Sequence, residues 1–487
     1  MATQEQQIAN IYEDTEAFRD SIATVDKQGK RIWLYPKKPS GRFYRWRTWV
    51  SFVFLAIFLT LPFIKFNGEP FFMLNVIERK FILFGLLFTP QDFHIFGLVM
   101  LTFLVFIILF TVVFGRLFCG WVCPQTVFME MFFRRIEYWI EGDAPAQRRL
   151  DKMPWNMEKI RKKGLKHAIF FLIAVIVSNY FLAYIIGMDQ VLRIIGEPLG
   201  AHLGGFVAMI LFSGAFYGVF ARLREQVCTT ICPYGRLQGV LLVKESIVVA
   251  YDYVRGEPRS KIKKNPVADI QAAVNGSASG IRKTGDCVDC KMCIAVCPTG
   301  IDIRNGTQLE CTNCTACIDA CDEIMDKTGR KRGLIRYDSA AGIERGSRKI
   351  FTPRVIAYSG LLAALIVLDI ILLAGRGSIE AIILRSPGQL FQERDETHLT
   401  NLYTYKLINK TTKDLPVSLR VATPGVQIEP VGQAVSLIPK GKRAEGAFFV
   451  IMPKNMLQGR KTPVVFEVWS EGKKMDAVKS SFMGPVQ

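Results

Sequence analysis

Hydrophobic residues form long, uninterrupted runs over most of the chain and short, alternating runs near its end. Long runs predict membrane-spanning helices, because about 20 apolar residues cross the hydrocarbon core of a bilayer. Five runs are predicted to span, at residues 49–64, 94–114, 167–187, 202–220 and 355–374. Another apolar piece, residues 81–88, is too short to cross and is expected to lie in the membrane interface.

Residues 375–487 have a different pattern, in which apolar and polar positions alternate over short runs separated by turn residues. A period of two predicts strands with one buried face. The runs lie at residues 403–407, 417–421, 426–431, 434–438, 447–452, 464–469 and 477–482. About seven strands over roughly a hundred residues predict an immunoglobulin-like sandwich. We expect an interaction or positioning role for this all-β domain, because no constellation of catalytic groups occurs in it.

The distribution of basic residues along the chain predicts which segments lie on which side of the membrane. The chain carries 62 Lys and Arg against 43 Asp and Glu, a net charge of +19, and half of its residues are hydrophobic. Basic residues flank the apolar runs, so we attribute the charge to topology and lipid headgroup contact rather than to nucleic acid. Residues 1–48, 115–166 and 222–354 are rich in Lys and Arg, whereas 65–93 and 188–201 carry few. The basic segments are therefore predicted to be cytoplasmic.

This topology divides the chain into five parts and places it in the inner membrane of a bacterium. The parts are a cytoplasmic N-terminal segment (1–48), a membrane region of four spans (49–221), a cytoplasmic segment (222–354), a fifth span (355–374) and a periplasmic β domain (375–487). No cleavable signal peptide is expected, because the N-terminal residues are polar and charged.

Eight of the twelve cysteines form two runs with the spacing Cys-x2-Cys-x2-Cys-x3-Cys. Bacterial ferredoxins hold two cubane clusters on such runs, and the fourth cysteine of each run ligates the other cluster. We therefore predict two [4Fe–4S] clusters in a ferredoxin-like cytoplasmic segment. One is expected on Cys287, Cys290, Cys293 and Cys321, and the other on Cys311, Cys314, Cys317 and Cys297.

Two other interpretations fit these runs less well. Zinc sites usually use cysteine pairs separated by a longer finger, and disulfides are uncommon in the reducing cytoplasm. Pro298 follows the first run but Asp322 follows the second. A proline there shapes the turn and is not a ligand, so the departure does not change the prediction.

The other four cysteines form two matching motifs, Cys119-Gly-Trp-Val-Cys123-Pro124 and Cys228-Thr-Thr-Ile-Cys232-Pro233. Each follows a span predicted to run inward, so both are expected at the cytoplasmic face. The i, i+4 spacing puts both sulfurs of a pair on one side of a helical turn, and the proline is expected to end or kink the helix. The four thiols could bind soft metal, as Cu(I) or a further iron–sulfur cluster, act as redox dithiols, or only pack. Duplication at equal depth argues against simple packing.

Three further residues lie in or beside predicted spans. His94 and His202 begin the second and fourth spans, where they would ligate a haem or metal or simply lie in the interface. Asp369 lies inside the fifth span, where a carboxylate is costly. Its alternatives are a functional role and a helix-packing hydrogen bond.

The run Gly115-Arg116-Leu-Phe-Cys119-Gly120-Trp121-Val-Cys123-Pro124-Gln125-Thr126, with the second motif and both ferredoxin runs, resembles the FixG/CcoG/RdxA family of bacterial cytochrome c oxidase accessory proteins. The resemblance covers nearly the whole chain. It implies maturation of the cbb(3)-type oxidase by reduction of Cu(II) to Cu(I), with oxidase subunits or copper chaperones as partners. It implies that the family's catalytic cysteines correspond to Cys119, Cys123, Cys228 and Cys232. It also implies that the family's cluster ligands correspond to the eight cysteines of the two ferredoxin runs. Similar membrane motifs occur in polyferredoxin subunits of nitrate and nitrous-oxide reductase systems, so the motifs alone leave the substrate open.

The working hypothesis is an electron relay. A cytoplasmic donor, which the sequence does not identify, reduces the two clusters, and single electrons pass to the four membrane-edge thiols, where Cu(II) becomes Cu(I). One alternative is a membrane subunit that passes electrons from quinol or ferredoxin to a periplasmic reductase. Another is a non-enzymatic scaffold or copper carrier that holds the nascent oxidase through the β domain.

Overall fold

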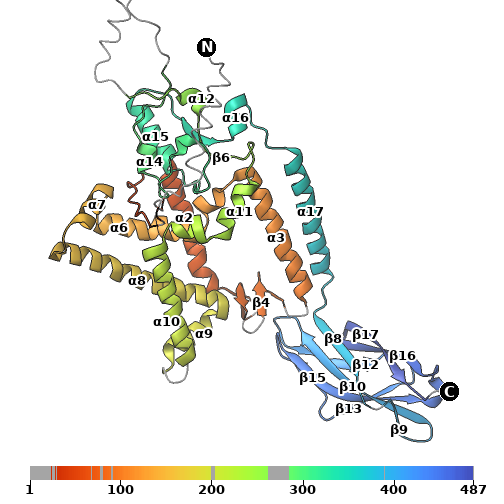
Figure 1. Cartoon of the computed structure of the whole chain (residues 1–487). Helices are drawn as coiled ribbons and strands as arrows, with labels where there is room; N and C mark the ends of the chain where they lie inside the picture. The colour runs from red at the N-terminus through yellow and green to blue at the C-terminus, as the bar shows by residue number, and fades with distance from the viewer. Residues whose placement is uncertain are drawn as a thin grey trace, which may run out of the picture. The chain divides into compact units, whose positions relative to one another are not determined.

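The structure, a computed structural model, describes residues 24, 28, 30–66, 68–76, 80–88, 92–198, 203–261, 284–388 and 390–485. Within these residues, five helices are long and apolar enough to cross a membrane (Figure 1). They are α2 (Arg42–Thr60) with the 3₁₀ turn after it, α3 (Phe93–Phe114), α8 (Met157–Ile186), α10 (Leu203–Gly218) with the π turn after it, and α17 (Pro353–Ala374). The five predicted spans are thereby confirmed. The chain is a membrane protein.

Helix α8 is longer than the bilayer requires. It has 30 residues, which at the α-helical rise makes it about 45 Å long, against about 30 Å for a hydrocarbon core. Its first turns are polar and basic, and the predicted span began only at residue 167. The helix therefore continues past the apolar region at its N-terminal end.

The chain divides into two compact units, which we describe separately. The first consists of Met1–Leu59, Thr102–Tyr180 and Glu197–Ala364, and the second of Thr60–Leu101, Phe181–Gly196 and Leu365–Gln487.

The ferredoxin-like part of the first unit surrounds the two cysteine runs. Strands β6 (Val248–Tyr251) and β7 (Ile335–Asp338) pair antiparallel. The helices that follow the runs are α14 (Met292–Ala295) and α15 (Ala316–Lys327). Short elements complete this part: α12 (Tyr253–Gly256), the 3₁₀ turn Ile303–Asn305 and α16 (Ala340–Arg345). Apolar side chains from all sides, including Val249, Ile318 and Met325, form one core around the cysteines.

Short helices and π-helical stretches connect the spans in the first unit. The helices are α4 (Leu117–Trp121), α5 (Pro124–Thr126), α6 (Arg134–Ile140), α7 (Ala144–Lys152) and α11 (Pro233–Leu241). The π-helical stretches are Val127–Phe133, Val219–Leu223 and Val227–Ile231. π-helical turns are rare and are often found at functional sites. All three lie within a few residues of the Cys-Pro motifs or contain one of their cysteines.

The ferredoxin-like part caps the first span. Helix α2 has no acidic residue in its first turn, which leaves backbone N–H groups in need of acceptors. The carboxylate of Asp319, on α15, accepts hydrogen bonds from the backbone N–H groups of Phe43 at 3.0 Å and Tyr44 at 2.8 Å. Gly41, with a φ of 139°, brings the chain into this contact. The start of α2 is thus fixed by a residue far along the sequence.

The second unit contains a two-sheet β sandwich. One sheet has the order β13-β15-β10-β8, with β9 paired to β10, and the other has the order β12-β16-β17. The strands are β8 (Ile379–Arg385), β9 (Gln392–Glu393), β10 (His398–Asn409), β12 (Ser418–Val421), β13 (Gln427–Val431), β15 (Arg443–Pro453), β16 (Lys461–Ser470) and β17 (Lys473–Met483), with a separate pair β11 (Leu415–Pro416) and β14 (Leu437–Ile438). The 3₁₀ turn Lys454–Met456 follows β15.

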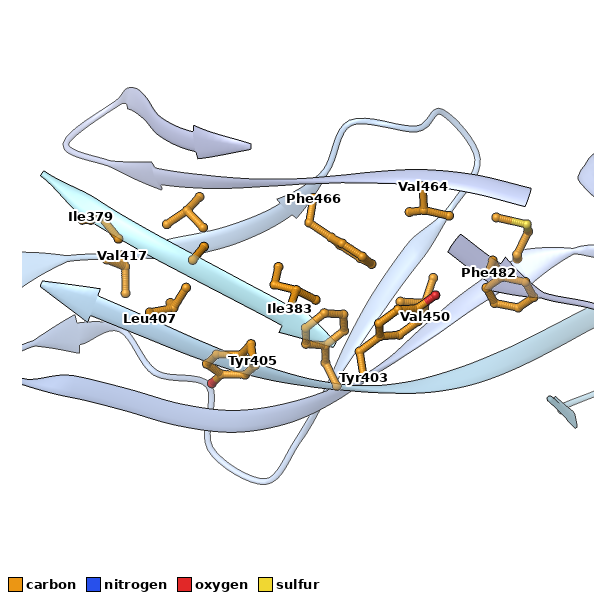
Figure 2. Packing of buried hydrophobic residues seen from close by; sticks show 14 of the residues in the cluster. Ile379, Ile383, Tyr403, Tyr405, Leu407, Val417, Val450, Val464, Phe466 and Phe482 are labelled. Carbon is orange, nitrogen blue, oxygen red and sulfur yellow. The ribbon is translucent and has the colours of Figure 1, made fainter. Parts of the chain in front are cut away.

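An aromatic cluster fills the space between the sheets. Tyr403 stacks on Phe448 with ring centroids 5.7 Å apart and packs edge-on against Phe466 at 5.2 Å. The Tyr403 hydroxyl donates to the carbonyl of Ser481 at 2.8 Å, so its one polar group is satisfied. Figure 2 shows Tyr403 and Phe466 in this cluster together with aliphatic side chains such as Val450. Burial of this cluster stabilises a sandwich that contains no cysteine.

The remaining elements of the second unit lie near the ends of the spans. Strands β3 (Met73–Asn75), β4 (Lys80–Leu83) and β5 (Leu86–Phe88) form a small antiparallel sheet, so the apolar piece at residues 81–88 is a β-hairpin. The pair β1 (Lys65–Phe66) and β2 (Glu69–Pro70) and the helix α9 (Met188–Gly196) complete the unit.

Two strand predictions need correction. Strand β8 was missed, because its outward positions Ile382 and Leu384 are also apolar and the run does not alternate cleanly. The strand predicted at residues 434–438 is reduced to Leu437 and Ile438.

Candidate redox site

The first cysteine cavity has a volume of about 350 Å³ and lies inside the ferredoxin-like core. Cys287, Cys290, Cys293 and Cys321 all line it, and its other walls are largely apolar. Cys290 is the exposed member of this group, whereas Cys287 and Cys293 are buried. This cavity brings together the four thiols predicted for the first cluster.

The second cavity, of about 340 Å³, is lined by Cys297, Cys311, Cys314 and Cys317, with Cys293 at its edge. None of its four principal thiols is exposed. The fourth cysteine of each run has crossed to the other cavity, as the ferredoxin spacing predicts. The role of the eight cysteines as ligands stays a prediction, and the donor sets fit it, since each cavity brings together the four thiols expected for one cluster.

The backbone has the same conformation around the second cysteine of each run. The flanking residues have positive φ in both runs, at Asp289 (46°) and Lys291 (57°) and at Asn313 (53°) and Thr315 (66°). Non-glycine residues rarely adopt this conformation, and alternation of right- and left-handed residues turns successive N–H groups toward one point. The repeated conformation therefore suits an anionic group in each cavity.

Burial controls the protonation of these thiols. It raises the pKa of Cys293, Cys311 and Cys321 to about 12 and that of Cys297 to about 11. Metal ligation requires the thiolate, so filling either cavity with iron must release protons from its cysteines.

The membrane-edge motifs do not form continuous helical turns. Cys119 lies in α4, but Cys123 is the extended residue (φ −56°, ψ 124°) that precedes Pro124 at the start of α5. Cys228 lies in a π turn, and Cys232 (φ −68°, ψ 115°) precedes Pro233 at the start of α11. The expectation of two sulfurs on one helical turn is therefore wrong, because a residue before proline is driven out of the helical region. The predicted helix break at each proline is present.

The four membrane-edge thiols are neighbours. Burial raises the pKa of Cys228 to about 12, and the adjacent Cys123 and Cys119 add to the shift. Burial likewise raises the pKa of Cys119 to about 11, with Cys123 and Cys232 contributing. In the part of the chain that the structure describes, no three His, Cys, Asp or Glu side chains are placed to hold a single metal ion. The thiols converge without forming a preassembled mononuclear site.

Two polar side chains at these thiols were missed by the sequence analysis. Gln238, fully buried on α11, donates from Nε2 to the Sγ of Cys119 at 3.4 Å. The buried hydroxyl of Thr126 lies beside the thiols of both Cys123 and Cys228. Thr126 is the third residue of α5, whose N-cap Cys123 makes no side-chain cap hydrogen bond, so no capping motif identifies it. Gln238 has no local sequence signal either.

The first motif also contacts the second cavity. A Cβ atom added at Gly120 would lie 2.6 Å from the carbonyl oxygens of both Thr312 and Asn313. Buried Arg47, on α2, donates from Nε to the carbonyl of Gly120 at 2.6 Å, and its Nη1 lies 3.5 Å from the carbonyl of Cys314. The segment that carries Cys119 and Cys123 is thus packed on the loop that carries Cys311 and Cys314.

The second motif is held by a buried network of charges. Glu225 pairs with Arg31 at 2.9 Å and lies 3.7 Å from Arg134, and its neighbour Arg224 pairs with Glu137. Arg224 has a φ of 53°, a strained conformation for this residue type that side-chain anchoring maintains. The network has five basic and five acidic members, so its charge is balanced: Arg31, Arg134, Lys163, Lys166, Arg224, Glu130, Glu137, Glu141, Asp151 and Glu225.

The other candidate residues are His94, His202 and Asp369. His94 is exposed at the start of α3, in the second unit, and His202 lies outside the described residues. Asp369 is buried within α17. Ligation by the two histidines and a functional role for Asp369 stay predictions.

Comparison with known proteins identifies the family. Residues 370–485 match the family described as the IG-like fold at the C-terminal of FixG. The chain is 34% identical over 445 residues to the nitrogen fixation protein FixG of Rhizobium meliloti, with 83% of this chain and 82% of that protein covered. The chain belongs to the FixG family. The protein RdxA of Cereibacter sphaeroides is a further relative, 31% identical over 428 residues that cover 85% of this chain and 87% of RdxA.

Two further matches concern the cofactor regions of this FixG-family chain. Residues 223–340 match the 4Fe–4S dicluster domain, and residues 96–143, which contain Cys119 and Cys123, match a 4Fe–4S binding domain. The crystal structure of the FixG-related protein from Vibrio parahaemolyticus covers 22% of this chain and 97% of its own, at 21% identity and a TM-score of 0.20. The predicted fold class is confirmed, with apolar spans, a dicluster ferredoxin domain and an immunoglobulin-like C-terminal domain. The chain is a membrane-bound iron–sulfur electron-transfer protein.

Proposed function

We propose that this FixG-family protein reduces Cu(II) to Cu(I) during assembly of a cbb(3)-type cytochrome c oxidase. The observation that carries the proposal is the contact between the second cysteine cavity and the segment of Cys119 and Cys123. Bound [4Fe–4S] clusters would supply storage and transfer of single electrons. Cys287, Cys290, Cys293 and Cys321 would hold one cluster, and Cys297, Cys311, Cys314 and Cys317 would hold the other.

The membrane-edge thiols suit copper as the substrate. Thiolates are soft ligands that favour Cu(I) over Cu(II), and Cys119, Cys123, Cys228 and Cys232 are brought together from two motifs. Each Cu(II) takes up one electron, which comes from a cytoplasmic one-electron donor, and each thiol that binds the resulting Cu(I) releases its proton. No thiol is oxidised in this scheme, so no disulfide accumulates.

The proposal includes the orientation given by the positive-inside rule. The ferredoxin domain and both motifs lie on the cytoplasmic side, and the immunoglobulin-like domain lies in the periplasm of a bacterial inner membrane. The partners are then a cytoplasmic electron donor and, for the product, a copper chaperone or an oxidase subunit. The β domain serves as a contact surface for the nascent oxidase.

The test uses the full-length protein in detergent or nanodiscs. Reduced protein is mixed with Cu(II), and Cu(I) is captured by a Cu(I)-specific chelator while iron and sulfide contents are measured on the same sample. Replacement of Cys119 and Cys123 by Ser is expected to abolish Cu(I) formation while leaving the iron of the ferredoxin domain in place. Trp139→Phe, at an exposed tryptophan outside both motifs, is the control. Unchanged Cu(I) formation in the double cysteine variant would remove the proposed role.

A second candidate has one specific observation in its favour. Because residues 96–143 match a 4Fe–4S binding domain, the four membrane-edge thiols could serve a further cluster in a carrier that connects quinol or ferredoxin to a periplasmic reductase. Acid-labile sulfide and paramagnetic resonance separate the two functions. A third cluster, oxidised by quinone and indifferent to Cu(II), would replace the copper proposal.

A further inference from the structure

Gly120 is required because the structure leaves no room for a side chain at this position, and not because of its backbone conformation. It lies in α4 between the thiol of Cys119 and the indole of Trp121, and only its lack of a side chain lets α4 approach the carbonyls of Thr312 and Asn313. A Cβ at 2.6 Å from two backbone oxygens would force the two segments apart. Neither oxygen belongs to a flexible side chain that could move aside.

A pair of hydrogen bonds fastens the same contact. The indole N–H of Trp121 donates to the hydroxyl of Tyr337 at 2.9 Å, and that hydroxyl donates to the carbonyl of Asn313 at 3.1 Å. Asn313 lies between Cys311 and Cys314, and Tyr337 is held in place by the pairing of β7 with β6. The chain of donors therefore runs from the first Cys-Pro motif to the wall of the second cavity.

The two cavities differ in this respect. The first contains the exposed Cys290, whereas none of the four principal cysteines of the second is exposed, and the second is the one whose loop touches α4. Electron tunnelling weakens steeply with separation and with gaps between packed groups. A route from solvent to the membrane-edge thiols through the ferredoxin domain thus begins at Cys290 and leaves by the loop of Cys311 and Cys314.

We propose that Gly120, Trp121 and Tyr337 are positioning residues that couple the second cavity to the thiols of Cys119 and Cys123. This inference rests on the proposed function only for the identity of the final acceptor. The contact determines how fast electrons leave the ferredoxin domain. None of the three residues is one of the cysteines that line the two cavities.

The experiment compares three variants with two matched controls. Gly120→Ala adds a Cβ that forces α4 away from the loop of Thr312 and Asn313. Trp121→Phe removes the indole donor, and Tyr337→Phe removes the hydroxyl. Gly97→Ala, in a helix with no atom near the added Cβ, and Trp139→Phe, at an exposed tryptophan, are the controls. Iron and sulfide content and the reduced-state paramagnetic spectrum establish that each variant is loaded.

Two readouts follow. Single-turnover reoxidation by Cu(II) is expected to slow about tenfold or more in Gly120→Ala, because a displacement of this size carries such a cost. It should slow about threefold in Trp121→Phe, which loses one hydrogen bond, and more in Tyr337→Phe, which loses both. The double variant Trp121→Phe/Tyr337→Phe should be no slower than Tyr337→Phe alone, because the hydroxyl takes part in both bonds. Independently of activity, amide exchange at residues 311–315 and maleimide labelling of Cys119 should both rise in Gly120→Ala and not in the controls.

The failures of the two proposals are distinguishable. Wild-type reoxidation rates in loaded Trp121→Phe and Tyr337→Phe protein would overturn the coupling role even if Gly120→Ala failed to fold, and would leave copper reduction intact. Absence of copper reduction in the wild-type protein would overturn the proposed function, while exchange and labelling would still report whether the contact holds the two segments together.

Discussion

The two Cys-x3-Cys-Pro motifs share a sequence pattern but have different surroundings. In both, the second cysteine is extended and begins a helix with proline at its first position. The first motif contains the buried Gly120 and is packed on the ferredoxin loop. No residue of the π turn Val227–Ile231 is buried, and the side chain of Ile231 is 57% exposed. The first motif is therefore packed on the ferredoxin loop, whereas the second has an exposed turn residue.

The difference shows that a duplicated motif need not have duplicated roles. Within the proposed function, the first motif is the side that receives electrons, because it touches the second cavity. The second motif is the side at which copper arrives, because its turn is accessible and the buried charge network behind it fixes its position. The convergence of the four thiols joins these two roles at one place.

The largest predicted effect separates the motifs kinetically. Loss of outer partners of a metal site already costs about 10- to 100-fold, so loss of a thiol should cost at least as much. Cys119→Ser should lower the rate at saturating Cu(II), whereas Cys232→Ser should raise the Cu(II) concentration needed for the half-maximal rate. Steady-state kinetics on both variants, with iron content as a control, measure this. The same kinetic change in both would show that the motifs do not differ in role.

A second prediction concerns the network behind the second motif. Glu137→Gln leaves the buried guanidinium of Arg224 without its carboxylate, which should lower the free energy of unfolding by about 3–5 kcal/mol. Thermal or denaturant unfolding in a fixed detergent gives the change. The matched control is Glu158→Gln, which removes an exposed pair with Lys162 and should have no measurable effect.

The pH dependence of the same carboxylate sharpens that test. Burial alone would raise the pKa of Glu137, but the charges of Arg224 and Lys166 outweigh burial and hold the pKa below its ordinary value. Such a group stabilises the fold fully above its unfolded-state pKa of about 4 and loses the contribution as pH falls through the folded value. Wild-type stability should therefore decline in acid more steeply than that of Glu137→Gln. Parallel declines would show that Glu137 is not the titrating group.

The smallest predicted effect is at Gln238. Gln238→Met keeps the side-chain volume but removes the donor to Cys119, and loss of such an outer partner is expected to slow copper reduction about tenfold. Leu237→Ala, on the exposed side of the same helix, is the control and should react as the wild type. A wild-type rate in Gln238→Met would restrict the residue to a packing role.

The sequence predicted those features that depend on local pattern. Five spans follow from the apolar length that a bilayer demands, and the grouping of eight cysteines into two cavities follows from their spacing. The contact of Gly120 with Asn313, the hydrogen bond from Gln238 and the position of Arg47 join residues far apart in the chain, and no periodicity records them. Strand β8 was missed because apolar Ile382 and Leu384 occupy its outward positions and hide the alternation. The helical turn expected at each motif was overruled by the proline beside it.

The capping of α2 by Asp319 has a consequence for biosynthesis. The first span leaves the ribosome early, but the carboxylate that accepts hydrogen bonds from its first turn is 276 residues further along the chain than Phe43. The first span to be synthesised is therefore among the last to be completed, and its completion waits for the segment that carries the second cysteine run. In a nascent chain whose ferredoxin domain fails to fold, the backbone N–H groups at the start of the first span would lack the Asp319 carboxylate as acceptor. Membrane quality-control proteases would then have a means to recognise the chain.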